Sequence, residues 1–208
     1  LDLNSTNTIS LFGVQGGGKS YTVGSILEMA TQTFDGINRL PSPLASVVFH
    51  YHENQDYPPE FVSMVEPNSD QVQIRNLQLG FNSNPRALQN VLILTSADKL
   101  EQRRLEFPNV QVEPIYFSSN ELSFKDWRFL MGVVGNQMYM KQINMIMRQL
   151  RGQLTLDHLR TQIETSPLTE AQKQIASIRL SFAAQFIDDN SSLADVLHPG
   201  RMIIVDLR

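Results

Sequence analysis

The sequence lacks cysteine in all of its 208 residues, which excludes disulfide bonds and thiolate metal sites. It also lacks any apolar run of about 18 residues, so no transmembrane helix is predicted. No basic segment followed by an apolar stretch opens the chain, and a signal peptide is therefore not predicted. We expect a protein without a membrane-spanning segment.

An excess of positive charge is missing too. The 17 lysines and arginines are outnumbered by 21 aspartates and glutamates, giving a net charge of −4. The chain as a whole therefore does not attract nucleic acid, and any contact with DNA would need a local patch or an assembled ring. With 41% hydrophobic residues and no internal repeat, the composition is that of one ordinary globular α/β domain.

The most informative segment is the glycine-rich run 13–20, which fits the phosphate-binding pattern G-x-x-x-x-G-K-[ST]. Its glycines let the backbone turn sharply and direct successive N–H groups at an anion. We expect Lys19 to act as the catalytic lysine on the β- and γ-phosphates, and the Ser20 hydroxyl to bind Mg²⁺. The predicted nucleotide-binding residues are Gly13, Val14, Gln15, Gly16, Gly17, Gly18, Lys19, Ser20 and Tyr21.

The sequence around this run predicts a strand, a loop and a helix in that order. A β-prone segment, 8–12, precedes it, and Val23, Ile26, Leu27 and Ala30 follow at the spacing of an amphipathic helix. The loop would then lie at a helix N-terminus, where the helix dipole favours an anion. The alternative is a glycine-rich turn without a ligand. A phosphate-binding loop in a chain without cysteine favours a cytoplasmic location.

Further strands are predicted at 46–52, 91–94, 110–117 and 202–206, separated by helical segments. This alternation predicts an α/β fold with a mostly parallel sheet flanked by helices. One ATPase domain, 1–208, would carry a helical segment at about 123–187. Capping boxes at Ser123 and Thr169 open two predicted helices. The first of these is a single long helix, whose expected buried residues are Trp127, Leu130, Met131, Val134, Met138, Ile143, Ile146, Met147 and Leu150. The expected buried residues of the second helix are Ile175, Ile178, Phe182 and Phe186.

The last predicted strand ends at Asp206, after four apolar residues. This pattern is typical of a Walker B segment, and Asp206 would then hold the outer coordination sphere of Mg²⁺. Alternatively, Asp206 only caps the following turn. The sequence stops at Arg208 with no acidic residue after Asp206, so we expect a fragment of a longer protein whose catalytic glutamate lies elsewhere.

Together these segments resemble the ATPase core of the HerA/FtsK superfamily, and most closely its HerA-like branch. The resemblance rests on the segments 13–20, 47–52 with Glu53 and Tyr57, 113–122 and 200–207. It implies a RecA-like ATPase that uses ATP and Mg²⁺, assembles as a hexameric ring and moves along double-stranded DNA. It also implies that the true Walker B aspartate lies beyond the C-terminus.

The chain departs from the family pattern at several positions. Gln15 and Gly17 stand where the family prefers a small hydroxyl residue, and His50 and His52 stand where the second strand often ends in aspartate. The few residues before the segment 8–12 are too short for the small barrel that usually precedes the ATPase core in this family, so we expect either that the barrel was removed or that this protein lacks it. His50 and His52 could bind a metal, but a surface pair at a strand end is the simpler interpretation.

Several arginine and methionine residues have more than one possible role. The pairs Arg103–Arg104 and Arg148–Arg151 could cover solvated helix faces, or supply an arginine finger to a neighbouring subunit. Met140 and Met145 are candidates for a subunit or domain contact.

Three other functions compete with a HerA-type DNA translocase or helicase. A GTPase is not favoured, because Ser96 replaces the lysine that packs on guanine and no D-x-x-G motif precedes it. A P-loop kinase would need a clustered arginine-rich lid. A nucleotide-gated assembly module would bind ATP without moving DNA. We expect ATP binding by this chain, with slow hydrolysis.

Overall fold

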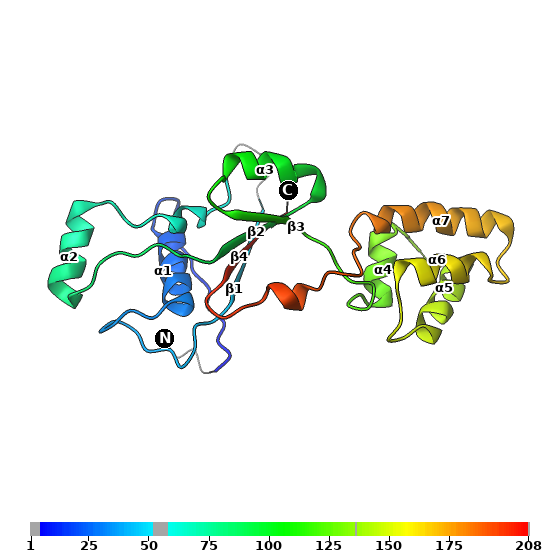
Figure 1. The fold of residues 1–208 in the computed structure, drawn as a ribbon, viewed down its shortest axis with the longest axis horizontal. Helices are drawn as coiled ribbons and strands as arrows, with labels where there is room; N and C mark the ends of the chain where they lie inside the picture. Colours follow the sequence, from blue (N-terminus) through cyan, green and yellow to red (C-terminus); the bar gives the residue numbers. More distant parts are fainter. Residues whose placement is uncertain (1–4, 52–57, 136, 208) are drawn as a thin grey trace. The chain divides into compact units, whose positions relative to one another are not determined.

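The computed structural model describes residues 5–51, 58–135 and 137–207. The chain divides into two compact units. A sheet unit contains Leu1–Pro114 and Leu197–Arg208, and a helical unit contains Ile115–Val196. The helical unit is therefore an insertion between two strands of the sheet unit (Figure 1). It contains the helical segment predicted at about 123–187.

In its described part, the sheet unit is built on four parallel strands in the order β1-β4-β2-β3. The strands are β1 (Ser46–His50), β2 (Val91–Thr95), β3 (Gln111–Pro114) and β4 (Met202–Asp206). The accompanying helices are α1 (Lys19–Thr31), α2 (Gln71–Phe81) and α3 (Leu100–Glu106), with short 3₁₀ turns η1 (Val62–Val65) and η2 (Ala97–Lys99). The predicted α/β class, with a parallel sheet flanked by helices, is confirmed, and it is compatible with a RecA-like fold.

The register of the strands explains their apolar sequences. Val48 lies opposite Ile204, Ile204 opposite Ile93, and Ile93 opposite Val112, so one apolar row crosses all four strands. This row belongs to a core that also includes side chains of α1, η1 and α3. Every residue of β2 and β4 is buried, as expected for central parallel strands covered on both faces.

The strand predicted at 8–12 is wrong. This segment is described as an irregular chain, and no described strand pairs with it. Its apolar side chains are exposed, Ile9 to 47% and Phe12 to 92%. A β-prone run becomes a strand only when a neighbouring strand accepts its hydrogen bonds, and here the described edge of the sheet is β1.

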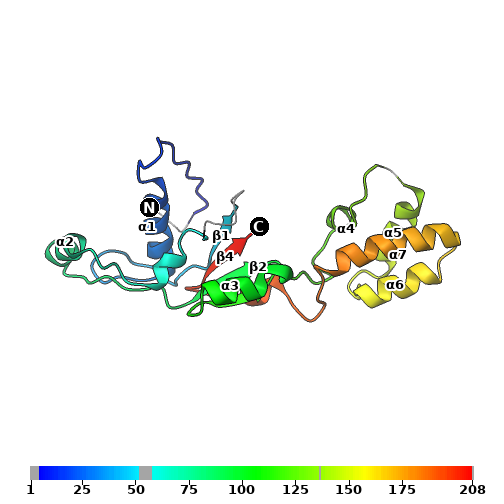
Figure 2. The same ribbon diagram turned by 90° about the horizontal axis from the view of Figure 1, so that it is seen from above.

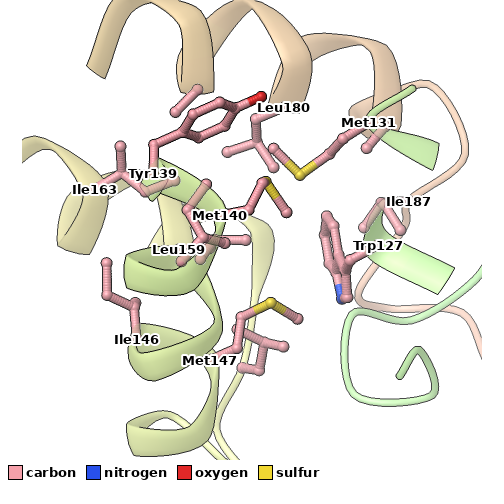
Figure 3. Packing of buried hydrophobic residues seen from close by; sticks show 14 residues of the cluster. Trp127, Met131, Tyr139, Met140, Ile146, Met147, Leu159, Ile163, Leu180 and Ile187 are labelled. Carbon is pink, nitrogen blue, oxygen red and sulfur yellow. The ribbon is translucent and has the colours of Figure 1, made fainter. Parts of the chain in front are cut away.

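The helical unit contains α4 (Phe124–Leu130), α5 (Met138–Gln149), α6 (Leu156–Glu164), α7 (Glu170–Ala184) and the 3₁₀ turn η3 (Leu193–Val196). Figure 2 shows α6 and α7 side by side. Trp127 and Met131 pack with residues of α5, α6 and α7 in a separate core (Figure 3). Both capping boxes are confirmed, one linking Ser123 with Asp126 and the other linking Thr169 with Gln172.

The single long helix predicted from Ser123 is wrong, because the chain breaks between α4 and α5. Gly132 and Gly135 have φ angles of 60° and 80° there, in the left-handed region that glycine tolerates best. Val134 and Met138 are therefore 87% and 71% exposed instead of buried. Met140 is buried in the core and is not available for a subunit contact.

The predicted inner face of α7 is also wrong. Ile175, Ile178 and Phe182 are exposed, whereas Ala176, Leu180 and Ala183 are buried. Small alanines let a neighbouring helix approach closely, and apolar residues on more than one side of this helix make its periodicity ambiguous.

Within the described part of the chain, no helix combines the length and apolar character needed to cross a membrane.

Candidate nucleotide-binding site

The glycine-rich run forms a tight loop that leads directly into α1. Gly16 and Gly18 have φ angles of 76° and 80°, which residues with a side chain rarely adopt. The Gly17 N–H donates to the Val14 carbonyl at 3.1 Å, closing a turn inside the loop. A Cβ at position 17 would lie only 3.0 Å from that same carbonyl oxygen. The conformation thus requires glycine at three consecutive positions.

The N-terminus of α1 is open to a ligand. Gly18 is its N-cap residue, and no described side chain caps the helix. The first helical bond at this end joins the Thr22 N–H to the Gly18 carbonyl, so the N–H groups of Lys19, Ser20 and Tyr21 precede the helical ladder. Such groups, together with the helix dipole, attract anions.

Lys19 folds back over the loop. Its Nζ donates to the carbonyl oxygens of Gly13 at 2.9 Å and Val14 at 2.8 Å. These two bonds hold the ammonium group against the first two residues of the loop. A lysine so placed presents a positive charge to any anion that enters the loop.

Ser20 contacts an acidic residue that sequence analysis missed. Its Oγ donates to Glu60 Oε1 at 3.3 Å. Glu60 lies 40 positions away, just after two prolines, and no motif in the sequence marks it. Only the folding of this segment against α1 places a carboxylate at Ser20.

A cavity of about 440 Å³ adjoins this contact, lined by Ser20, Tyr21, Glu60 and Phe61 among others. Phe61 has a φ of 59°, unusual for a bulky residue, and Cβ at Gly24 would lie 3.4 Å from its ring. The small Gly24 therefore lets the Glu60–Phe61 segment approach α1. Glu28 also lines the cavity, and burial raises the pKa of its carboxyl group.

Asp206, the other predicted Mg²⁺ residue, is engaged in a buried ion pair. Arg103 Nε donates to Asp206 Oδ2 at 2.7 Å, and the two residues are only 3% and 4% exposed. Burial acts to lower the pKa of Arg103, but its hydrogen bonds to Glu106 and Asp206 outweigh burial and raise it. The interpretation of Arg103 as part of a solvated helix face is wrong, whereas Arg104 is exposed.

The remaining predicted ligands do not converge. His50 lies opposite Asp206 at the end of β1, while His52, Glu53 and Tyr57 lie outside the described residues. Among residues 5–51, 58–135 and 137–207, no group of three acidic, histidine or cysteine side chains could hold a metal ion. A divalent cation at the glycine loop would thus depend on a ligand for most of its coordination.

Comparison of the chain with models of protein families, with curated proteins and with solved structures finds no match.

Proposed function

We propose that residues 13–20 form a P-loop that binds Mg²⁺·ATP, and that the sheet unit is the RecA-like ATPase domain of a HerA-type DNA translocase. The observation that carries this proposal is the loop itself. It has left-handed glycines, a lysine held over it and an open helix N-terminus beyond it.

Each residue of the loop has a defined task in this proposal. The glycines let the backbone approach the phosphates closely, and the N–H groups at the start of α1 donate to them. The ammonium group of Lys19 exchanges its bonds to Gly13 and Val14 for bonds to the β- and γ-phosphates. It neutralises the charge that develops during phosphoryl transfer.

The oxygen atoms near the loop fit Mg²⁺. This ion prefers hydroxyl, carboxylate and phosphate oxygens and is usually bound through only one or two protein groups. The Ser20 hydroxyl and the Glu60 carboxylate supply such a pair, 3.3 Å apart. When bound, Mg²⁺ would be held by Ser20 and Glu60 and would supply positive charge that offsets the negative charge of the nucleotide phosphates.

A second function, ATP binding that organises partners without DNA movement, is favoured by one observation. The carboxylate of Asp206 is occupied by Arg103, so it is not free to polarise water or hold a cation. Glu60 then remains the described carboxylate in contact with Ser20. In the motor hypothesis a catalytic glutamate must come from elsewhere.

ATP binding by the Lys19→Ala variant tests the P-loop. We expect at least a tenfold loss of affinity for ATP in a calorimetric titration, about 1.4 kcal/mol or more, because the ammonium charge is lost. The fold should survive, since Lys19 is only half-buried. Lys141→Ala, which removes an exposed lysine of α5, is the matched control. Equal affinity in both variants would reject the proposal.

The motor and assembly hypotheses differ in their response to DNA. A translocase should form rings with Mg²⁺·ATP and double-stranded DNA, and DNA should stimulate its turnover. An assembly module should oligomerise with ATP while its turnover stays insensitive to DNA. Mass photometry and a steady-state ATPase assay on the same samples distinguish the two.

A further inference from the structure

The helical unit contains a cavity of about 370 Å³ that the proposed ATP site does not use. It lies at the end of α5, where the chain turns through Gly152, and the segment before α4 forms its other wall. Its apolar side is lined by Phe124, Met147 and Leu154, and its polar side by serine, asparagine and arginine side chains. The volume falls in the range of small-molecule sites.

The charged residues that line this cavity are all positive. Arg148 and Arg151 line it, and no acidic residue does. Neither arginine forms an ion pair with any residue that the structure describes, and both are exposed. The nearby carboxylate of Asp189 instead accepts the backbone N–H groups of Ser119 and Leu156, at 2.7 Å each. Two guanidinium groups thus remain available to an anion.

A buried hydroxyl group in the same wall lacks a partner. Ser119 is fully buried, lines the cavity, and its Oγ makes no hydrogen bond within the described structure. Buried polar groups nearly always have a hydrogen-bond partner, so a buried hydroxyl group without one in a cavity wall indicates that a ligand supplies the missing partner. Asn120 accepts the Leu154 N–H at 3.1 Å through its Oδ1, which leaves its amide group as a further donor.

We propose that this cavity binds the phosphate group of a nucleotide. Arg148 and Arg151 pair with the phosphate oxygens, for which planar guanidinium groups are the preferred partners. Ser119 donates its hydroxyl hydrogen to the same phosphate. The aromatic ring of Phe124 and the side chain of Met147 supply an apolar surface for the base. The ligand is either a free nucleotide or the end of a single-stranded nucleic acid, and the site is independent of the glycine loop.

The experiment follows backbone amide resonances of the full chain by NMR while ligand is added. All proteins carry Lys19→Ala, so that the glycine loop contributes no phosphate binding through its lysine. The probes are inorganic phosphate, AMP and a five-nucleotide single-stranded DNA with a 5′-phosphate. The test variants are Ser119→Ala and Arg148→Gln combined with Arg151→Gln. The control is Arg160→Gln, which removes an equivalent charge from α6 in the same unit.

We expect AMP to shift the amides of residues 119–124 and 147–154 in a saturable way. The double arginine variant should bind at least tenfold more weakly, Ser119→Ala severalfold more weakly, and Arg160→Gln as the parent does. DNA binding at least tenfold tighter than AMP at the same residues identifies the strand end as the ligand, and the opposite order identifies the free nucleotide. Absence of saturable shifts with every probe, or an equal loss in Arg160→Gln, would overturn the proposal.

Discussion

Asp206→Asn should destabilise the sheet unit, because it removes the charge that Arg103 meets inside the protein. The two side chains lie 2.7 Å apart, and each is no more than 4% exposed. Breaking a buried ion pair by removing one partner costs about 3–5 kcal/mol. We expect about 3 kcal/mol for Asp206→Asn, since asparagine keeps an acceptor oxygen and Glu106 still pairs with Arg103. Arg103→Met should cost more, because it leaves the Asp206 carboxylate buried without its partner.

The double variant Arg103→Met with Asp206→Leu distinguishes the effect of losing one partner of the ion pair from the effect of losing side-chain packing. Replacing a buried ion pair by apolar groups of similar volume is often neutral, so this protein should recover most of the lost stability. Arg104→Met is the matched control. Its pair with Glu101 is exposed, with side-chain exposures of 48% and 82%, and such pairs contribute about 0–1 kcal/mol.

Hydrogen exchange of β2 and β4 peptides in increasing urea is the suitable assay. Tryptophan fluorescence is not, because Trp127, the single tryptophan of the sequence, lies in the helical unit. A change below about 1 kcal/mol for Asp206→Asn, or an equal change for Arg104→Met, would refute the argument. The Asp206→Asn variant also tests whether Asp206 helps to bind Mg²⁺. If Arg103 occupies Asp206, the Mg²⁺ dependence of ATP binding should match that of the parent.

Three further predictions concern the loop, the nucleotide and acid stability. Gly17→Ala should weaken ATP binding about tenfold or more in calorimetry, because the alanine Cβ would lie 3.0 Å from the Val14 carbonyl oxygen and distort the loop. Unchanged affinity would contradict the loop geometry. ATP should outcompete GTP in a displacement assay, since no guanine-reading motif is intact, and a GTP preference would revive the GTPase hypothesis. The helical unit should lose stability on acidification. Hydrogen bonds from Ser123 lower the pKa of Asp126, and hydrogen bonds from Asn190 and Ser191 lower the pKa of Asp188. The two carboxylates therefore contribute fully to the stability of the folded unit above the unfolded pKa of about 4, and this stability is lost as the pH falls through their folded pKa values. Trp127 fluorescence in urea at pH 7 and pH 3 measures this, and equal midpoints would contradict it.

The elements that sequence predicts well are those with local signals. The central strands 91–95 and 202–206 are short apolar runs between turns, and a covered parallel sheet requires that pattern. The capping boxes at Ser123 and Thr169 satisfy the first turns of their own helices and depend on nothing distant. For the same reason the glycine loop and the start of α1 follow from one continuous segment.

The features that sequence does not predict depend on distant partners. Glu60 reaches Ser20, and Arg103 reaches Asp206 across 103 positions, because the fold brings separate segments together. The burial of Arg103 carries no sequence signature, since an arginine on a short helix is ordinarily solvated. The segment 8–12 has strand composition, but composition cannot say whether a neighbour will pair with it.

The position of β4 governs the order in which the sheet can be completed during synthesis. β4 is the last strand of the sequence, yet it lies between β1 and β2. The ribosome makes the whole helical unit after β3 and before β4, which takes several seconds at about 5–20 residues per second. Throughout that interval the facing edges of β1 and β2 have no strand between them, and only at its end does the helical unit have all the residues of its own core. A nascent chain stalled before Met202 would therefore expose two unpaired edges beside a folded insertion, a state prone to aggregation and a natural target for chaperones.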